Sequence, residues 1–144
     1  MKRLWKNRKG SATLLYFGMV FMLLLMTMLI IEMGSTMENY SYAESVLQRA
    51  CNSAVVRNIL DAYRADHILR MNNIGAAADF RNYVQNDLPE KYRLTIDRIR
   101  CTAEPPTMEV TGKLTFETVF SQFGFGIVTY SFKVVSTNYA LDGR

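Results

Sequence analysis

The clearest pattern along the chain is an apolar block that follows a basic head. No charged residue occurs from Gly10 to Ile31, and residues 14–31 consist almost entirely of Leu, Met, Ile, Phe, Val and Tyr. An α-helix rises about 1.5 Å per residue, so about 20 such residues cross the roughly 30 Å of bilayer hydrocarbon. The pattern predicts a transmembrane helix over residues 11–34.

Apolar residues continue at helical spacing beyond this block, from residue 35 to about residue 70. Gly34 is the one residue of low helix propensity between the two stretches, so we expect a single helical rod of roughly 50 residues, about 75 Å long. The stripe that would face a core is formed by Ala43, Leu47, Cys51, Val55, Ile59 and Tyr63.

A second, shorter helix is predicted over residues 76–87. Asn72, Asn73 and Gly75 interrupt the first helical pattern, and Pro89 ends the second. The residues expected on its buried side are Ala77, Phe80, Val84 and Leu88.

The remainder of the chain changes to a period of two, which indicates strands with one buried face. Alternating apolar residues mark a strand from Met108 to Phe116, a second precedes it with a slip in register between Ile96 and Ile99, and a third covers residues 128–134. Three consecutive strands with short links favour an antiparallel meander, whose apolar face needs a cover. We therefore predict a membrane-anchored α+β protein, with the exported helix packed on a small meander.

The distribution of charge predicts topology. Once the five basic residues before the apolar block are set aside, 12 basic residues face 13 acidic ones, so nucleic-acid binding is not expected. By the positive-inside rule, residues 1–10 form a cytoplasmic leader and residues 35–144 an extracytoplasmic domain of a single-pass cell-membrane protein. A cleaved secretory signal is the competing interpretation, but the apolar run is longer than such signals have.

Residues that could support catalysis are sparse. The one histidine, His67, has no second histidine or cysteine pair at metal-ligand spacing, and serine elbows and phosphate loops are missing. We expect neither enzymatic activity nor a cofactor. Cys51 and Cys101 fall where helix would cover sheet. They would form either a disulfide, worth about 4 kcal/mol for a loop of about 50 residues, or two buried thiols.

Two segments resemble a known family. The sequence RKGSATLLYF from residue 8 resembles a class III signal of the type IV pilin superfamily. IIEMG at residues 30–34 and LQRA at residues 47–50, followed by small residues up to Arg57, are similar to TadE-like minor pilins or pseudopilins of tight-adherence secretion systems. The resemblance covers residues 8–57.

This resemblance implies a non-catalytic subunit that a prepilin peptidase cuts between Gly10 and Ser11. Its other partners would be further pilin or pseudopilin subunits and a membrane assembly platform, in a surface pilus or secretion apparatus.

The family commonly has a glutamate five residues after the cut, followed by an aromatic residue. This chain has Leu15 and Tyr16 there, so ordinary major-subunit polymerisation is not expected. The alternative is an uncleaved bitopic component of another export or conjugation machinery.

Further positions are candidates for assembly contacts. Glu32 lies about 31 Å along the helix from Ser11, and its role is either subunit pairing or marking the end of the span beside Gly34. Small residues let helices approach closely. Ala43, Ala50 and Ala54 would therefore either admit a neighbouring helix or pack inside the domain itself.

Overall fold

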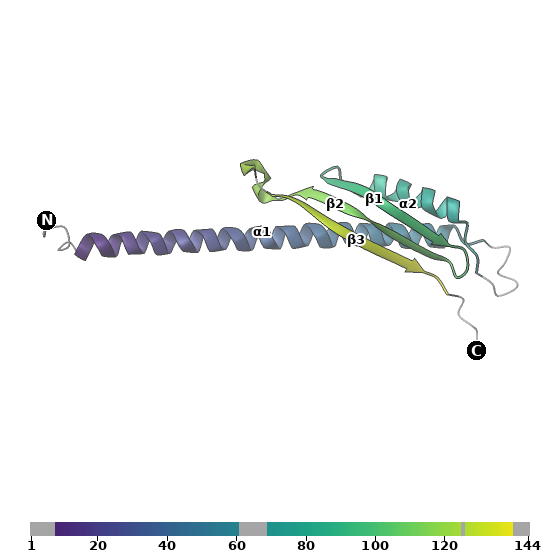
Figure 1. The fold of residues 1–144 in the computed structure, drawn as a ribbon, viewed down its shortest axis with the longest axis horizontal. Helices are drawn as coiled ribbons and strands as arrows, with labels where there is room; N and C mark the ends of the chain where they lie inside the picture. Colours follow the sequence, from purple (N-terminus) through teal and green to yellow (C-terminus); the bar gives the residue numbers. More distant parts are fainter. Residues whose placement is uncertain (1–7, 61–68, 125, 140–144) are drawn as a thin grey trace.

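The computed structural model describes residues 8–60, 69–124 and 126–139. The elements in chain order are α1 (Arg8–Arg57), α2 (Asn73–Asp87), β1 (Tyr92–Thr102), β2 (Thr107–Glu117), the short 3-10 helix η3 (Val119–Phe123) and β3 (Ile127–Thr137). Figure 1 shows α1 as a long rod with the other elements gathered along its C-terminal half. The predicted α+β class, with a long apolar N-terminal helix and a small antiparallel sheet, is confirmed.

The helix α1 contains 50 residues, so it is about 75 Å long and matches the predicted rod. Every described side chain from Ala12 to Ile31 is exposed, whereas the C-terminal half presents a buried stripe to the rest of the fold. Gly34 does not interrupt it, and a Cβ built on Gly34 would meet nothing within 4 Å. The helix is therefore stable enough on both sides of Gly34 to tolerate the roughly 1 kcal/mol cost of an interior glycine.

The prediction that this helix reaches about residue 70 is wrong, because α1 ends at Arg57. The side-chain amide of Asn58 donates from Nδ2 to the Ala54 carbonyl oxygen at 2.9 Å and so competes for a helical acceptor. The chain then pairs with the segment leading to α2: Asn72 N donates to Asn58 O at 2.9 Å, and Ile59 forms a bridge with Met71. Tyr63 and His67 lie outside the described residues.

The second helix begins three residues earlier than predicted. Asn72 acts as its N-cap, since the side-chain oxygen accepts from the Ile74 and Gly75 amides, both at 3.2 Å. Asparagine is among the preferred residues at this position, so the segment interpreted as a helix breaker is a helix start. Ala76, rather than the predicted Ala77, joins Phe80 and Val84 in the core.

The sheet is an antiparallel meander with strand order β1-β2-β3, as predicted. Leu94 pairs with Leu114, and Leu114 pairs with Tyr130. The predicted register slip is a bulge between Ile96 and Arg98. One extra residue reverses which face the following side chains occupy, and for this reason the inward positions change from even to odd numbers along β1.

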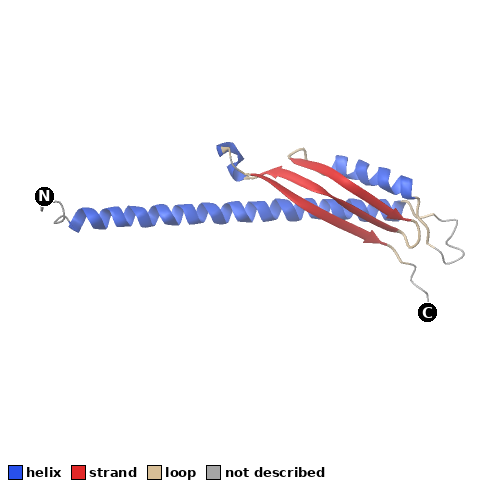
Figure 2. Ribbon diagram, in the orientation of Figure 1, coloured by secondary structure: helices blue, strands red, loops and turns tan. Residues whose placement is uncertain are grey.

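Both helices cover the same face of the sheet, and the core lies between these two layers (Figure 2). The opposite face carries polar side chains, such as Lys113 on β2 and Lys133 on β3, which pairs with Glu109 at 3.2 Å. Large side chains that are fully or almost fully buried include Leu47, Val55, Phe80, Val110, Leu114, Phe116 and Val134.

Gly112 occupies an inward position on β2 that has no room for a side chain. A Cβ there would lie 2.9 Å from Cε1 of Phe132, its partner on β3. The Phe132 ring therefore covers the glycine and fills the space that its missing side chain leaves, an arrangement that stabilises glycine within sheets.

Candidate functional site

The most distinctive contact in the fold joins the end of the apolar half of α1 to the end of β2. Thr118, which is 5% exposed, donates a hydrogen bond from Oγ1 to Oε1 of Glu32. The backbone N–H of Thr118 also donates to Gly126 O at 2.7 Å, which closes the β2–β3 connection. Glu32 therefore holds this connection against α1 where the exposed apolar stretch stops.

Gly126 is required at this contact for two reasons. Its φ of 100° lies in a region that side chains other than glycine rarely adopt. A Cβ would also lie 3.3 Å from the Glu32 oxygen and overlap Thr118 Oγ1. The second carboxylate oxygen, Oε2, is buried and has no hydrogen-bond partner among the described residues.

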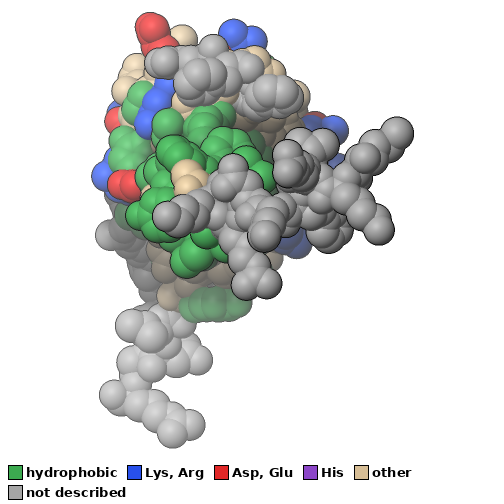
Figure 3. All heavy atoms as spheres, turned by 90° about the vertical axis from the view of Figure 1, so that its left-hand side faces the viewer, with side chains coloured by type: hydrophobic (Ala, Val, Ile, Leu, Met, Phe, Trp, Pro, Cys, Tyr) green, Lys and Arg blue, Asp and Glu red, His purple; other side chains and the backbone are tan. Residues whose placement is uncertain are grey.

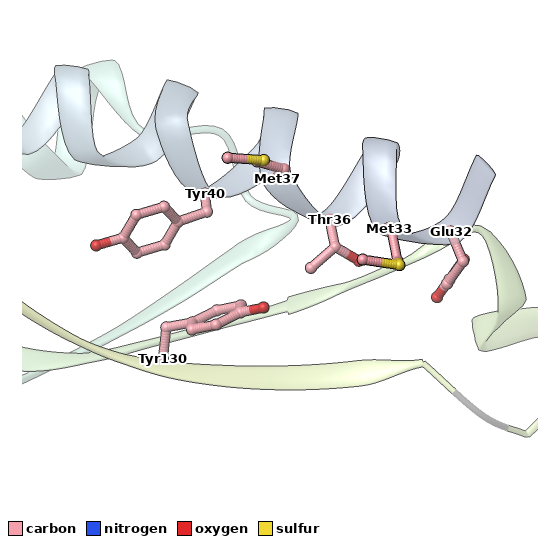
Figure 4. Close-up of a pocket in the computed structure, with 6 residues that line it drawn as sticks. All are labelled: Glu32, Met33, Thr36, Met37, Tyr40 and Tyr130. Atoms are coloured by element: carbon pink, nitrogen blue, oxygen red, sulfur yellow. The ribbon is translucent and has the colours of Figure 1, made fainter. Parts of the chain in front are cut away.

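A groove of about 320 Å³ runs along α1 from this carboxylate toward the sheet. It is lined by Glu32, Met33, Thr36, Met37 and Tyr40 of α1 and by Tyr130 of β3. Figure 4 shows Tyr130 rising from β3 toward Tyr40, with Glu32 at the other end, and the two ring centroids are 5.2 Å apart. The groove combines one carboxylate with aromatic and thioether surface.

Asn39 forms a second junction about two helical turns beyond Glu32 on α1. Its Oδ1 accepts from Lys91 Nζ and from Tyr92 Oη, both at 2.9 Å, while its amide donates to Ser35 O at 2.8 Å. The Tyr92 ring also stacks on Tyr42. Together these contacts tie the start of β1 to the same part of α1 that Thr118 contacts.

The two cysteines come together as the sequence suggests, but both are free thiols. Cys51 Sγ lies 3.6 Å from Met108 O, and Met108 pairs with Cys101 in the sheet. Burial, and then the neighbouring Cys101, raise the pKa of Cys51 to about 12, and burial also raises the pKa of Cys101. Both groups are therefore held as protonated thiols near neutral pH.

The three alanines do not form an outward surface. Ala43, Ala50 and Ala54 are 0%, 2% and 0% exposed within the chain itself, because the stripe they share with Leu47 faces α2 and the sheet. Of the two roles that the sequence leaves open for these alanines, their burial supports packing inside the domain, where they allow its own elements to approach α1. The outward face is mostly polar, with Glu44, Arg49 and Ser53 exposed, and it also presents Val56, which is 60% exposed.

The remaining candidates lie on the N-terminal half of α1 or at its end. Leu15 and Tyr16 are both exposed, and Gly34 is exposed close to Glu32. Gly10 and Ser11 fall in the first turns of α1. Among the described residues, no group of three His, Cys, Asp or Glu side chains could hold a metal ion.

Glu32 is recognisable from the sequence as the carboxylate that ends the apolar block, but its partners are not. Thr118 and Tyr130 lie 86 and 98 positions further along the chain, and no local pattern distinguishes them from other strand residues.

One described helix, α1, has a stretch long and apolar enough to cross a membrane, which by itself is weak evidence for a span. Comparisons with protein-family models, with curated proteins and with solved structures found no match to this chain.

Proposed function

We propose that this chain is a non-catalytic pseudopilin or minor pilin subunit of a surface pilus or secretion apparatus. The observation that carries the proposal is the division of α1. One continuous helix has an N-terminal half whose apolar side chains are all exposed and a C-terminal half that forms one layer of a small α+β domain. Exposed apolar surface on this scale requires a lipid or protein environment.

In this proposal the N-terminal half of α1 crosses the cell membrane, with the basic head in the cytoplasm and the α+β domain outside. The domain acts by contact, since its grooves offer aromatic, thioether and carboxylate surface. The exposed face of α1 around Glu44, Arg49 and Ser53 is the part of the rod that neighbouring subunits would meet. Further partners would be a prepilin peptidase and a membrane assembly platform.

Processing at Gly10 tests this proposal against the uncleaved alternative. Coexpression with the prepilin peptidase from the same genome should remove residues 1–10, so that intact-mass analysis shows a chain beginning at Ser11. Gly10→Ala should slow or abolish the cut. Gly18→Ala is the matched control, because a Cβ built on Gly18 meets nothing within 4 Å in the same helix, and this variant should be cut normally. An unchanged mass in the wild-type chain would instead favour an uncleaved bitopic component.

A further inference from the structure

The β2–β3 connection carries exposed apolar side chains and no charged ones. No charged residue occurs between Glu117 and Lys133, and the segment includes Val119, Phe120 and Ile127. Val119 is 51% exposed and Ile127 is 72% exposed. Bulky apolar side chains presented to the surface at a strand connection indicate a binding surface when they gather at one place. We call residues 118–124 together with residues 126–127 the apolar tip.

The apolar tip lies at the end of the domain nearest the N-terminal half of α1 (Figure 1). Thr118 fixes its position, because its hydroxyl is bonded to Glu32 directly after the exposed apolar stretch from Ala12 to Ile31. That stretch rises about 30 Å, which matches the hydrocarbon thickness of a bilayer. If the stretch spans the membrane, the apolar tip therefore lies at the outer membrane surface.

Charged side chains beside the apolar tip have the sign that suits phospholipid headgroups. Lys91 and Arg93 line a small hollow together with Ile127, and Glu117 is the acidic side chain in the same lining. Figure 3 views the molecule from the N-terminal end of α1, so the hydrophobic side chains in its middle include the apolar half of that helix, and charged side chains lie toward the edge. Basic residues next to apolar ones are typical of surfaces that rest on anionic membranes.

We infer that the apolar tip inserts into the interfacial layer of the membrane that α1 crosses. Val119 and Ile127 enter the boundary between headgroups and acyl chains, while Arg93 contacts lipid phosphates. Lys91, whose Nζ also donates to Asn39, adds positive charge beside it. The domain then has two attachments to the membrane, α1 and the apolar tip, which restrict its rotation about the helix axis. This inference rests on the membrane span proposed above and adds the lipid surface as a partner of the domain.

Site-specific tryptophan fluorescence tests the inference on the full chain. The one native tryptophan, Trp5, is changed to phenylalanine, and V119W or I127W supplies the probe. V135W is the matched control, since Val135 is 42% exposed on β3, in the half of the strand that pairs with the start of β2. Each variant is placed, one copy per disc, in nanodiscs of phosphatidylcholine and phosphatidylglycerol, with or without bromine near the headgroup end of the acyl chains. Circular dichroism first checks that each variant is folded.

V119W and I127W should show blue-shifted emission that brominated lipid largely quenches, while V135W should be quenched by acrylamide and not by bromine. Equal acrylamide quenching of all three probes would overturn the inference. So would a blue shift without bromine quenching, which would indicate a protein cover. If one tip variant does not fold, the other decides. If V119W and I127W both lack the blue shift and the bromine quenching while the chain is still cut normally at Gly10, only the membrane insertion of the apolar tip is rejected. The proposed function then stands.

Discussion

At the residue scale, Glu32 and Thr118 link the two parts of the molecule. A carboxylate placed where an apolar helix meets a domain is costly to desolvate unless it is bonded, and here the Thr118 hydroxyl supplies a bond to one oxygen. The packing of Gly126 against both side chains leaves no space for a larger residue. The position of the β2–β3 connection on α1 therefore depends on three residues from distant parts of the chain.

The cysteine pair gives a test at the same scale. In the reduced, folded protein at pH 8.5, iodoacetamide should alkylate Cys101 well before Cys51. Cys51 is fully buried with a pKa of about 12, whereas Cys101 is half-buried, and only the thiolate reacts. Peptide mass mapping over time measures both rates.

Cys101→Ser provides the control for this labelling, since the variant should take up label only when it is unfolded. Equal rates at the two cysteines would contradict the burial of Cys51. A protein isolated without titratable thiols and lighter by two hydrogens would mean that the pair is bridged, the other outcome that the sequence allows.

At the element scale, α1 performs two tasks in one continuous helix. Its first half presents apolar side chains all round, as a lipid-facing helix does, and its second half has the one-sided apolar stripe of a helix that covers a sheet. The small residues in this stripe bring α1 close to α2 and β3. Larger residues would separate the layers and loosen the core around Phe116 and Val134.

Overpacking that stripe should affect folding directly. Ala54→Leu is expected to lower the free energy of unfolding of the domain by about 1–3 kcal/mol, because Ala54 is fully buried and its surroundings are already filled. Ser53→Leu, one residue earlier on the exposed face, should change it by less than about 0.5 kcal/mol. Denaturant titration of the full chain in detergent, followed by circular dichroism, measures both. If Ala54→Leu has normal stability but no longer supports pilus assembly, the alanines would instead form a contact between subunits.

At the scale of the whole molecule, the fold is a rod with a two-layer domain on one side of its C-terminal half (Figure 1). In the proposed arrangement the membrane holds the bare half of the rod, and the domain lies just outside with the apolar tip toward the lipid. Interaction with neighbouring subunits would then take place along the polar outward face of α1 and around the tyrosine-lined groove.

Topology is the corresponding test for the whole chain. A reporter that is active only outside the cytoplasm, fused after Arg144, should be active, because five basic residues precede the apolar block and the remaining charge is balanced. The same reporter fused before Met1 should be inactive. If, instead, a C-terminal fusion is active only with a reporter that works in the cytoplasm, the orientation is the opposite of the one proposed. That result would remove the basis for the pilin proposal.

The sequence alone determined those features that depend on local periodicity. The rod is predicted by the uncharged block and the helical stripe, and the meander by the alternation along the strands, since each reflects a repeat of 3.6 or 2 residues. The bulge is predicted because the apolar positions change from even to odd numbers between Ile96 and Ile99. The tertiary structure alone decided where α1 stops, because Ile59 pairs with Met71 instead of extending the helix. It also decided that Ala43, Ala50 and Ala54 face inward and that Thr118 meets Glu32. These outcomes depend on contacts between distant segments, which local periodicity does not encode.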